Sequence, residues 1–323
     1  MISNQLGSTN HTVTRIGLGL AALGRPGYIN LGHGEDLSGR NRYTDLEHHA
    51  RSVLDAAYEL GIRYFDTARS YGDGEAFLGR WLDEKNAMAG VDAIVASKWG
   101  YRYVADWRID VPVHEVKEHD LASLDRQYRE TRERLGEDLA IYQIHSATLE
   151  SGVLDNDAVL DRLAAIKAGG VTVGLSTSGP NQAAVICRAL AIERDGERLF
   201  GTVQSTWNLL ETSAGSALAT ASAEGMGVII KESVANGRLT ERDPDSVASL
   251  RAALPDFTPD AVAIAAVLAQ PFVDVVLSGA ATRDQLQSNL AARSVDPDQL
   301  NRLPDMAENP EAYWARRSRL SWT

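Results

Sequence analysis

The sequence has few of the residues that build cross-links or soft metal sites. Cys187 is the only cysteine among 323 residues, so the chain cannot form an internal disulfide or a thiolate metal cage. No apolar run approaches the ~18 residues of a membrane span. Residues 1–17 also lack the basic and apolar segments of a signal peptide. We therefore expect no metal centre, no membrane contact and a cytoplasmic location.

Positive charge is also scarce. The 32 Lys and Arg residues are outnumbered by 44 Asp and Glu, which gives a formal net charge of −12 and a pI near 5.1. Nucleic acids and anionic membranes attract surfaces rich in Lys and Arg, so neither is an expected partner. With 44% hydrophobic and 24% charged residues, the composition is that of a folded globular protein. The oligomeric state cannot be predicted from these features.

One unit repeats along the chain: a short apolar run, a loop, an amphipathic stretch, and often a glycine before the next apolar run. Residues 46–60 have helical spacing, Gly61 follows them, and the apolar residues after it predict a strand. Eight strands are predicted, at about 13–20, 62–66, 93–98, 139–144, 171–176, 201–206, 226–231 and 273–278. Crossover helices fit between successive strands, so the sheet should be parallel.

Eight such units in a chain of this length favour a closed (β/α)₈ barrel over an open doubly wound sheet. No linker rich in Ser, Gly or Pro divides the chain, so we expect a single domain over 1–323. Three long segments, at about 24–44, 99–119 and 232–257, each follow a predicted strand. We expect them at the C-terminal face of the barrel, where barrel enzymes keep their active sites.

Two motifs resemble known sites but do not meet their spacing. Gly17, Gly19 and Gly24 resemble a dinucleotide fingerprint, yet the third glycine is two positions late and the match begins inside a strand. His114 and His119 are five residues apart, about 140° on a helix, whereas a zinc helix separates its histidines by four. We expect a charged, solvated loop around these histidines.

Four polar residues lie where barrel catalysis would need them. Asp66 ends the second predicted strand and Tyr71 follows five residues later, while Lys98 and His145 end the third and fourth strands. Each residue alone has a structural explanation: a loop cap, a surface aromatic, a lysine at a strand end, a core histidine. Together on one face they suit protonation of a carbonyl oxygen while a cofactor supplies hydride to the carbon.

The four residues also suit one another electrostatically. An ammonium beside a phenol lowers the pKa of the phenol by favouring the phenolate. We expect Lys98 to act in this way on Tyr71, Asp66 to pair with Lys98, and a neutral His145 to orient the substrate oxygen. A class I aldolase with a Schiff base on Lys98 is an alternative, but it needs a neutral lysine, which the paired Asp66 disfavours.

These segments resemble the aldo-keto reductase superfamily, and the resemblance covers nearly the whole chain. Residues 61–72, 97–100 and 142–145 are similar to the segments that carry the family's catalytic Asp, Tyr, Lys and His. The resemblance implies a (β/α)₈ barrel that binds a nicotinamide nucleotide without a Rossmann domain. It implies NADP(H)-dependent reduction of an aldehyde or ketone with Tyr71 as proton donor. Alternatives are an NAD-dependent sugar dehydrogenase and a non-catalytic regulatory subunit that binds nucleotide.

The resemblance also implies cofactor contacts. Ser176 and Gln204 match residues that contact the carboxamide, and Trp207 takes the place of a tyrosine on which the nicotinamide stacks. The family's usual Ser-Pro is Glu-Ser at 232–233. The other expected nucleotide contacts are Thr177, Ser233, Gly237, Leu239, Gly279, Thr282, Arg283, Gln285 and Asn289.

Two further expectations concern specificity. Many relatives have an arginine where this chain has Ala281. Arg283 lies two residues further on, at the start of a predicted helix over 282–292, and we expect it to bind the 2′-phosphate of NADP(H) instead. Tyr28, Trp99 and Trp107 lie in the loops after the first and third strands. We expect them to line an aromatic substrate pocket.

Overall fold

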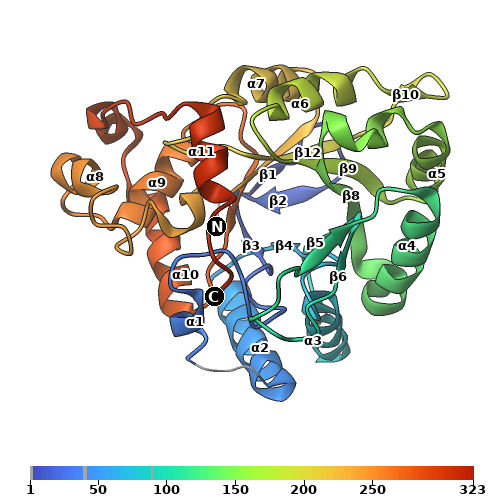
Figure 1. Ribbon diagram of the computed structural model, residues 1–323, viewed down its shortest axis with the longest axis horizontal. Coiled ribbons are helices and arrows are strands. Elements are labelled where there is room, and N and C mark those ends of the chain that lie inside the picture. Colours follow the sequence, from blue (N-terminus) through green and yellow to red (C-terminus); the bar gives the residue numbers. More distant parts are fainter. Residues whose placement is uncertain (1–2, 39–41, 89) are drawn as a thin grey trace.

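Eight strands close into a parallel barrel with helices packed around it (Figure 1). The computed structural model describes residues 3–38, 42–88 and 90–323. The strand order is β12 (Thr202–Thr206), β13 (Gly227–Lys231), β14 (Val275–Ser278), β3 (Ile16–Gly19), β4 (Tyr64–Asp66), β5 (Ile94–Trp99), β8 (Leu139–Ala147) and β9 (Thr172–Thr177), which returns to β12. The predicted (β/α)₈ barrel is confirmed.

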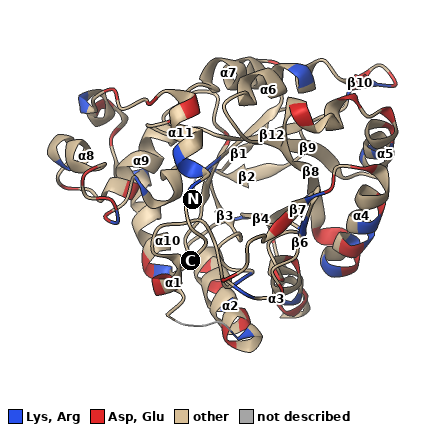
Figure 2. Ribbon diagram, in the orientation of Figure 1, with Lys and Arg blue, Asp and Glu red and all other residues tan. Residues whose placement is uncertain are grey.

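Helices follow the barrel strands along the chain and cover the outside of the barrel. They are α2 (Tyr43–Glu59), α3 (Gly74–Met88), α4 (Leu121–Leu135), α5 (Asp157–Ala168), α6 (Gln182–Leu190), α7 (Gly215–Ala223), α9 (Pro259–Leu268) and α10 (Arg283–Leu290). In α2 the apolar face, including Leu46, Ala50 and Val53, is buried. Acidic and basic side chains mix along outer helices such as α2 and α4 (Figure 2). These charged residues therefore lie on the outside, and the apolar face of α2 points to the strands.

The inside of the barrel has its own apolar core, separate from the one between strands and helices. Tyr64, Ala96, Ile141 and other inward residues pack there against Leu6 and Val13. Those two residues come from a hairpin of β1 (Ser3–Gln5) and β2 (Thr12–Thr14), which precedes the N-terminal end of β3. The prediction of one strand over 13–20 is therefore wrong, because its first residues leave the barrel to cover the inner core.

The three long loops predicted at the C-terminal end carry short elements of their own. These are α1 (His33–Asp36) in 24–44, β6 (Tyr101–Tyr103) and β7 (Glu115–Lys117) in 99–119, and α8 (Ala248–Ala253) in 232–257. Residues 39–41 of the first loop lie outside the described residues. The prediction of a solvated loop around His114 is wrong, because that residue is 6% exposed and lies between the antiparallel strands β6 and β7, directly before β7.

Smaller elements complete the chain. They are β10 (Glu193–Arg194), β11 (Glu197–Arg198) and the 3₁₀ turns η1 (Gly136–Asp138), η2 (Leu149–Ser151), η3 (Val153–Asp155), η4 (Ala235–Gly237), η5 (Ala291–Ser294) and η6 (Pro297–Arg302). Among the described residues, no helix is long and apolar enough to cross a membrane.

The end of the chain forms a segment that the sequence did not predict. After α11 (Pro310–Arg317), residues 318–323 run toward α1 (Figure 1). Thr323 and Tyr28 exchange two backbone hydrogen bonds of 3.2 Å. The last residues of the chain are thereby tied to the first active-site loop.

Candidate active site

Strand alternation decides which polar side chains reach the mouth of the barrel. Residues i and i+2 of a strand point to the same face. Tyr64 and Ala96 belong to the core inside the barrel, so Asp66 and Lys98 also point inward, one step closer to the C-terminal end. The same alternation in β8 turns His145 inward. Three of the four predicted catalytic residues therefore meet at one end of the barrel for a local, geometric reason.

Lys98 is held between the carboxylate and the phenol. Its Nζ donates hydrogen bonds to Asp66 Oδ1, to the backbone oxygen of Thr67 at 3.0 Å and to Tyr71 OH at 3.5 Å. Lys98 is 0% exposed and Asp66 is 2% exposed. The second carboxylate oxygen of Asp66 accepts a hydrogen bond of 2.8 Å from Gln204 Nε2. The ammonium is thus fixed beside the phenol by a fully engaged carboxylate.

The proton of Tyr71 is held more tightly than the sequence suggested. Burial raises the pKa of Tyr71 well above its usual value, and the charge of Asp66 raises it further, while the Arg25 guanidinium opposes them. The expectation that Lys98 lowers the pKa of Tyr71 below its usual value is therefore wrong, because burial and the charge of Asp66 raise it. The consequence is a phenol that keeps its proton at neutral pH and remains able to donate it.

His145 meets Tyr71 edge to face, with ring centroids 5.5 Å apart and planes at 85°. The register of β8 against β9 shifts beside it, and the next residue, Ser146, has a φ of +51°. Such a bulge re-aims the neighbouring side chain. Ser176 Oγ accepts a 2.8 Å hydrogen bond from Ser146 N. Ser176, expected to bind cofactor, thus supports the bulge that positions His145.

The imidazole of His145 is neutral at physiological pH. Burial lowers the pKa of His145 well below its ordinary value, and the charges of Lys98, Lys231 and Arg25 lower it further. A neutral imidazole can share one hydrogen bond with a substrate oxygen without adding charge to the site. This agrees with the role expected of it from the sequence.

A cavity of about 580 Å³ opens above these residues, within the size range of small-molecule sites. At the catalytic end it is lined by Asp66, Tyr71, His145, Gln204, Tyr28, Tyr101 and Trp322. It continues along residues expected to bind nucleotide, namely Ser233, Gly237, Gly279, Gln285 and Asn289. One continuous space therefore joins the two sets of residues. Within the described residues, no group of three or more potential ligands is arranged to hold a metal ion.

Trp207 does not line this cavity. Because Gln204 points inward, Trp207, an odd number of positions later, points toward the helices. It is 7% exposed and packs against Phe272 with ring centroids 6.0 Å apart. The expectation that it stacks on the nicotinamide is therefore wrong.

Three more predicted contacts lie outside the cavity lining, two of them because of the same alternation. Thr177 follows the inward Ser176 and instead donates a 2.9 Å hydrogen bond to Ser205 Oγ. Trp99 follows Lys98 and is completely buried on the helix side. Trp107 packs against Tyr43 at 5.3 Å, also away from the cavity. Of the three expected substrate aromatics, the structure places only Tyr28 on the cavity wall.

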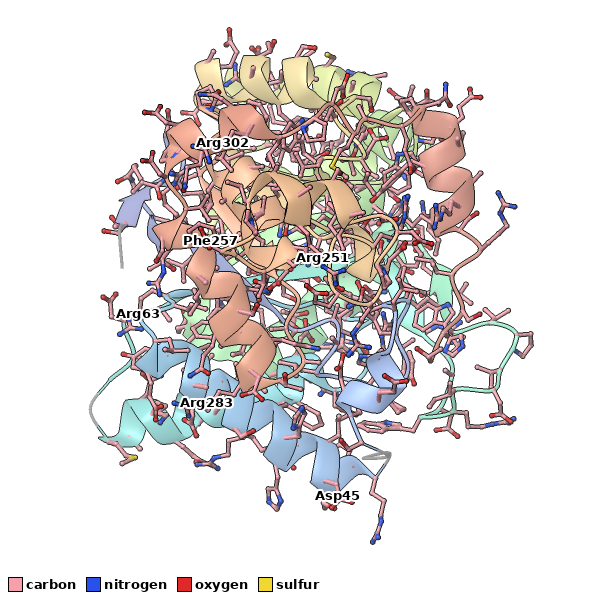
Figure 3. The ribbon with its side chains drawn as sticks, turned by 90° about the vertical axis from the view of Figure 1, so that its left-hand side faces the viewer. Asp45, Arg63, Arg251, Phe257, Arg283 and Arg302 are labelled. Atoms are coloured by element: carbon pink, nitrogen blue, oxygen red, sulfur yellow. The ribbon has the colours of Figure 1, made fainter. Side chains whose placement is uncertain are left out.

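Of the residues expected along the pyrophosphate and the adenosine, some line the cavity and others do not. Gln285 and Asn289 line the cavity, but Leu239 belongs to the core and Thr282 caps α10 by accepting a hydrogen bond from Gln285 N. Arg283 lies outside the cavity lining, where α10 meets α2 (Figure 3). Its Nη2 is 3.5 Å from Glu59 Oε2, and both side chains are more than half exposed.

Arg25 and the end of the chain are parts of the site that the sequence analysis missed. Arg25 is 1% exposed, pairs with Glu115 and donates a 2.7 Å hydrogen bond to the backbone oxygen of Ser70. Its guanidinium lies 5.4 Å from the Tyr71 ring and 4.6 Å from the Trp322 ring. No sequence pattern indicated these contacts, since they join loops far apart in the chain.

Lys231 and Glu232 were also not predicted from the sequence, although the alternation of side chains in β13 indicates Lys231. Ile229 belongs to the inner core, so alternation turns Lys231 inward at the end of β13. Glu232, with a φ of +57°, accepts hydrogen bonds from Arg317 of α11 at 2.9 and 3.0 Å. This ion pair anchors the C-terminal segment to the barrel.

Comparison with known proteins gives one family. The model of the aldo/keto reductase family matches residues 15–308. The chain is 24% identical to the uncharacterized oxidoreductase YqkF of Bacillus subtilis, over 98% of this chain and 100% of that one. It is 28% identical to a D-threo-aldose 1-dehydrogenase of Pseudomonas sp, over 96% and 97%. The aldo-keto reductase AKR11C1 from Bacillus halodurans, in its holo form, shares the fold with a TM-score of 0.73 and 22% identity, over 96% and 97%.

Proposed function

The chain belongs to the aldo/keto reductase family, and on this premise we propose that it is an NADP(H)-dependent oxidoreductase that reduces an aldehyde or ketone to the alcohol. The observation that carries the proposal is the hydrogen-bonded set Asp66–Lys98–Tyr71, of which Asp66 and Tyr71 line one cavity together with a neutral His145.

The cavity suits a nicotinamide nucleotide. The side-chain amides of Gln204, Gln285 and Asn289 lie along it, each also hydrogen bonded within the protein. Gly279 leaves backbone exposed there, since a Cβ at this position would meet no atom within 4 Å. The bound nucleotide supplies the hydride that adds to the carbonyl carbon. No side chain could supply it.

The protein's own residues then handle the proton. Tyr71 donates its phenolic proton to the carbonyl oxygen, so that the new C–H and O–H bonds complete the alcohol. The ammonium of Lys98, 3.5 Å away, stabilises the phenolate that remains. His145 orients the carbonyl oxygen. General acid catalysis of this kind contributes roughly 10²–10⁴-fold.

NADP(H) is the nucleotide in this proposal because two arginines lie near the far end of the cavity. Arg242 lines the cavity and Arg283 begins α10, the helix that also carries Gln285. The exposed pair of Arg283 with Glu59 is of a kind worth at most about 1 kcal/mol. Because this ion pair is weak, the guanidinium of Arg283 can exchange Glu59 for a 2′-phosphate.

Oxidation of a sugar is the second candidate. The similar protein named D-threo-aldose 1-dehydrogenase aligns over 96% of this chain, and the same catalytic residues serve the reverse reaction. Tyr28, Tyr101 and Trp322 line the catalytic end and offer aromatic faces to a sugar ring.

Turnover assays with both nucleotides test these proposals. Aldehydes and ketones are assayed with NADPH and NADH, and aldoses with NADP⁺ and NAD⁺, using the parent and Tyr71→Phe. Carbonyl reduction that is faster with NADPH and lost in Tyr71→Phe supports the proposal. Turnover restricted to aldoses favours the dehydrogenase, and nucleotide binding without turnover on either panel indicates a regulatory subunit.

A further inference from the structure

Lys231 is a cation on the cavity wall that the proposed chemistry does not use. It ends β13, two positions after Ile229, and lines the same cavity as Asp66, Tyr71 and His145. Its side chain is 16% exposed. A charged lysine on this wall interacts electrostatically with any ligand that fills the cavity.

The strand order places Lys231 across the barrel mouth from Lys98. In the closed order of eight strands, β13 and β5 are four positions apart in either direction. Tyr71 follows β4 and His145 lies in β8, so both flank the β5 side. Tyr71 and His145 would hold the carbonyl on their side. The β12–β13 side, with Gln204 and Lys231, is then left for the nicotinamide ring that delivers hydride.

Lys231 shares its carboxylate with another cation. Among the described residues at the catalytic end, three other cations each form an ion pair: Lys98–Asp66, Arg25–Glu115 and Arg317–Glu232. Lys231 Nζ is 3.6 Å from Glu232 Oε1, which Arg317 already engages, and it donates its hydrogen bond to the neutral Thr206 Oγ1 at 3.0 Å. The catalytic end therefore has one cation in excess, although the whole chain has a net charge of −12.

Further positive charge at this end is unfavourable. Burial lowers the pKa of Lys231 to about 8; the charge of Glu232 raises this pKa, and the charges of Arg317 and Lys98 lower it. A reduced nicotinamide ring is neutral and an oxidised ring carries one positive charge, while the rest of the nucleotide is the same. The two forms therefore differ in the charge of the ring, and it is this charge that interacts with the ammonium of Lys231.

We infer that Lys231 biases the site against binding of the oxidised nucleotide and so favours binding of the reduced cofactor. This inference rests on the proposed function, since it requires a nicotinamide at the catalytic end. A contact between Lys231 and a phosphate would strengthen binding of both forms alike. The ratio of the two affinities separates the bias from such a contact.

The test is equilibrium binding of NADPH and NADP⁺, followed by calorimetry, to the parent, Lys231→Met and Lys231→Arg. The ratio of the Kd for NADP⁺ to the Kd for NADPH is expected to fall about tenfold in Lys231→Met, and to stay near the parent value in Lys231→Arg. An unchanged ratio in Lys231→Met would overturn the inference, whether both affinities weaken equally or neither changes.

Two controls keep the outcome specific. Lys167→Met makes the same change in net charge on α5, outside the barrel, and should leave the ratio unaltered; a fall as large as in Lys231→Met would point to net charge alone and would overturn the inference. Circular dichroism and thermal unfolding establish that Lys231→Met is folded. If the parent binds neither NADPH nor NADP⁺, the proposed function fails; if it binds both with a ratio insensitive to Lys231, only the inference fails.

Discussion

The two sides of the barrel mouth hold their polar residues in different ways. On the β4–β5–β8 side, Lys98 and Asp66 are completely buried, paired and hydrogen bonded. On the β12–β13 side, Lys231 relies on a neutral hydroxyl, and Glu232 depends on Arg317 from the C-terminal segment. Residues at strand ends form the Lys98–Asp66 pair of the first side, whereas Glu232 of the second side is held by Arg317 near the end of the chain. We expect substitutions on the first side to stop catalysis and those on the second to change stability and nucleotide preference.

The largest effect is expected on the first side, from Tyr71→Phe. Loss of the phenolic proton should lower kcat by roughly 10²–10⁴-fold, while the Kd for NADPH stays within about twofold of the parent. Steady-state kinetics and nucleotide titration measure the two quantities. A kcat within threefold of the parent would show that Tyr71 is not the proton donor.

On the second side, Glu232→Gln should destabilise the protein at neutral pH. It removes the carboxylate that pairs with Arg317 and leaves weaker hydrogen bonds, which lowers the free energy of unfolding by about 1.5–3 kcal/mol. The pKa of Glu232 is lowered to about 2, mainly by Arg317 and against the effect of burial. Because this pKa is depressed, its stabilisation is complete above about pH 4.5 and is lost as the pH falls toward 2.

Denaturant unfolding of the parent and Glu232→Gln at pH 7 and at pH 3 checks both points. The difference between the two proteins should be smaller at pH 3. Equal unfolding free energies at pH 7 would mean that the C-terminal segment does not depend on this pair.

A third, smaller effect is expected from the pH dependence of nucleotide preference. Lys231 faces Glu232 of its own strand end, Arg317 of α11 and Lys98 of β5. Below about pH 8 the lysine is charged and should disfavour NADP⁺. Above that pH the ratio of the Kd for NADP⁺ to the Kd for NADPH should fall toward the value in Lys231→Met. Titrations from pH 6 to pH 10 would contradict this if parent and variant gave parallel curves.

The smallest effect on nucleotide binding is expected from Trp207→Leu. Trp207 packs against Phe272 outside the cavity lining, so a shorter side chain lowers stability but leaves the Kd for NADPH within about twofold. Unfolding and binding are measured on the same preparation. A tenfold loss of affinity in a folded variant would restore Trp207 to the cofactor site.

Much of the catalytic side could be predicted from the sequence, because strand alternation is a local property. The inward positions of Tyr64 and Ala96 determine those of Asp66 and Lys98. Applied to every strand, the same rule would also have turned Trp207 outward and Lys231 inward. A motif match alone does not determine the side of the strand on which a residue lies.

The sequence by itself determined the eight-stranded barrel and the residues at its strand ends, since apolar periodicity and side-chain alternation act over a few residues. Only the tertiary structure decided that Arg25 packs against Trp322, and that Arg317 pairs with Glu232. It also decided that burial raises the pKa of Tyr71, against the expected effect of Lys98. Contacts between distant loops and the burial of charge depend on the whole packed chain, and no local pattern records them.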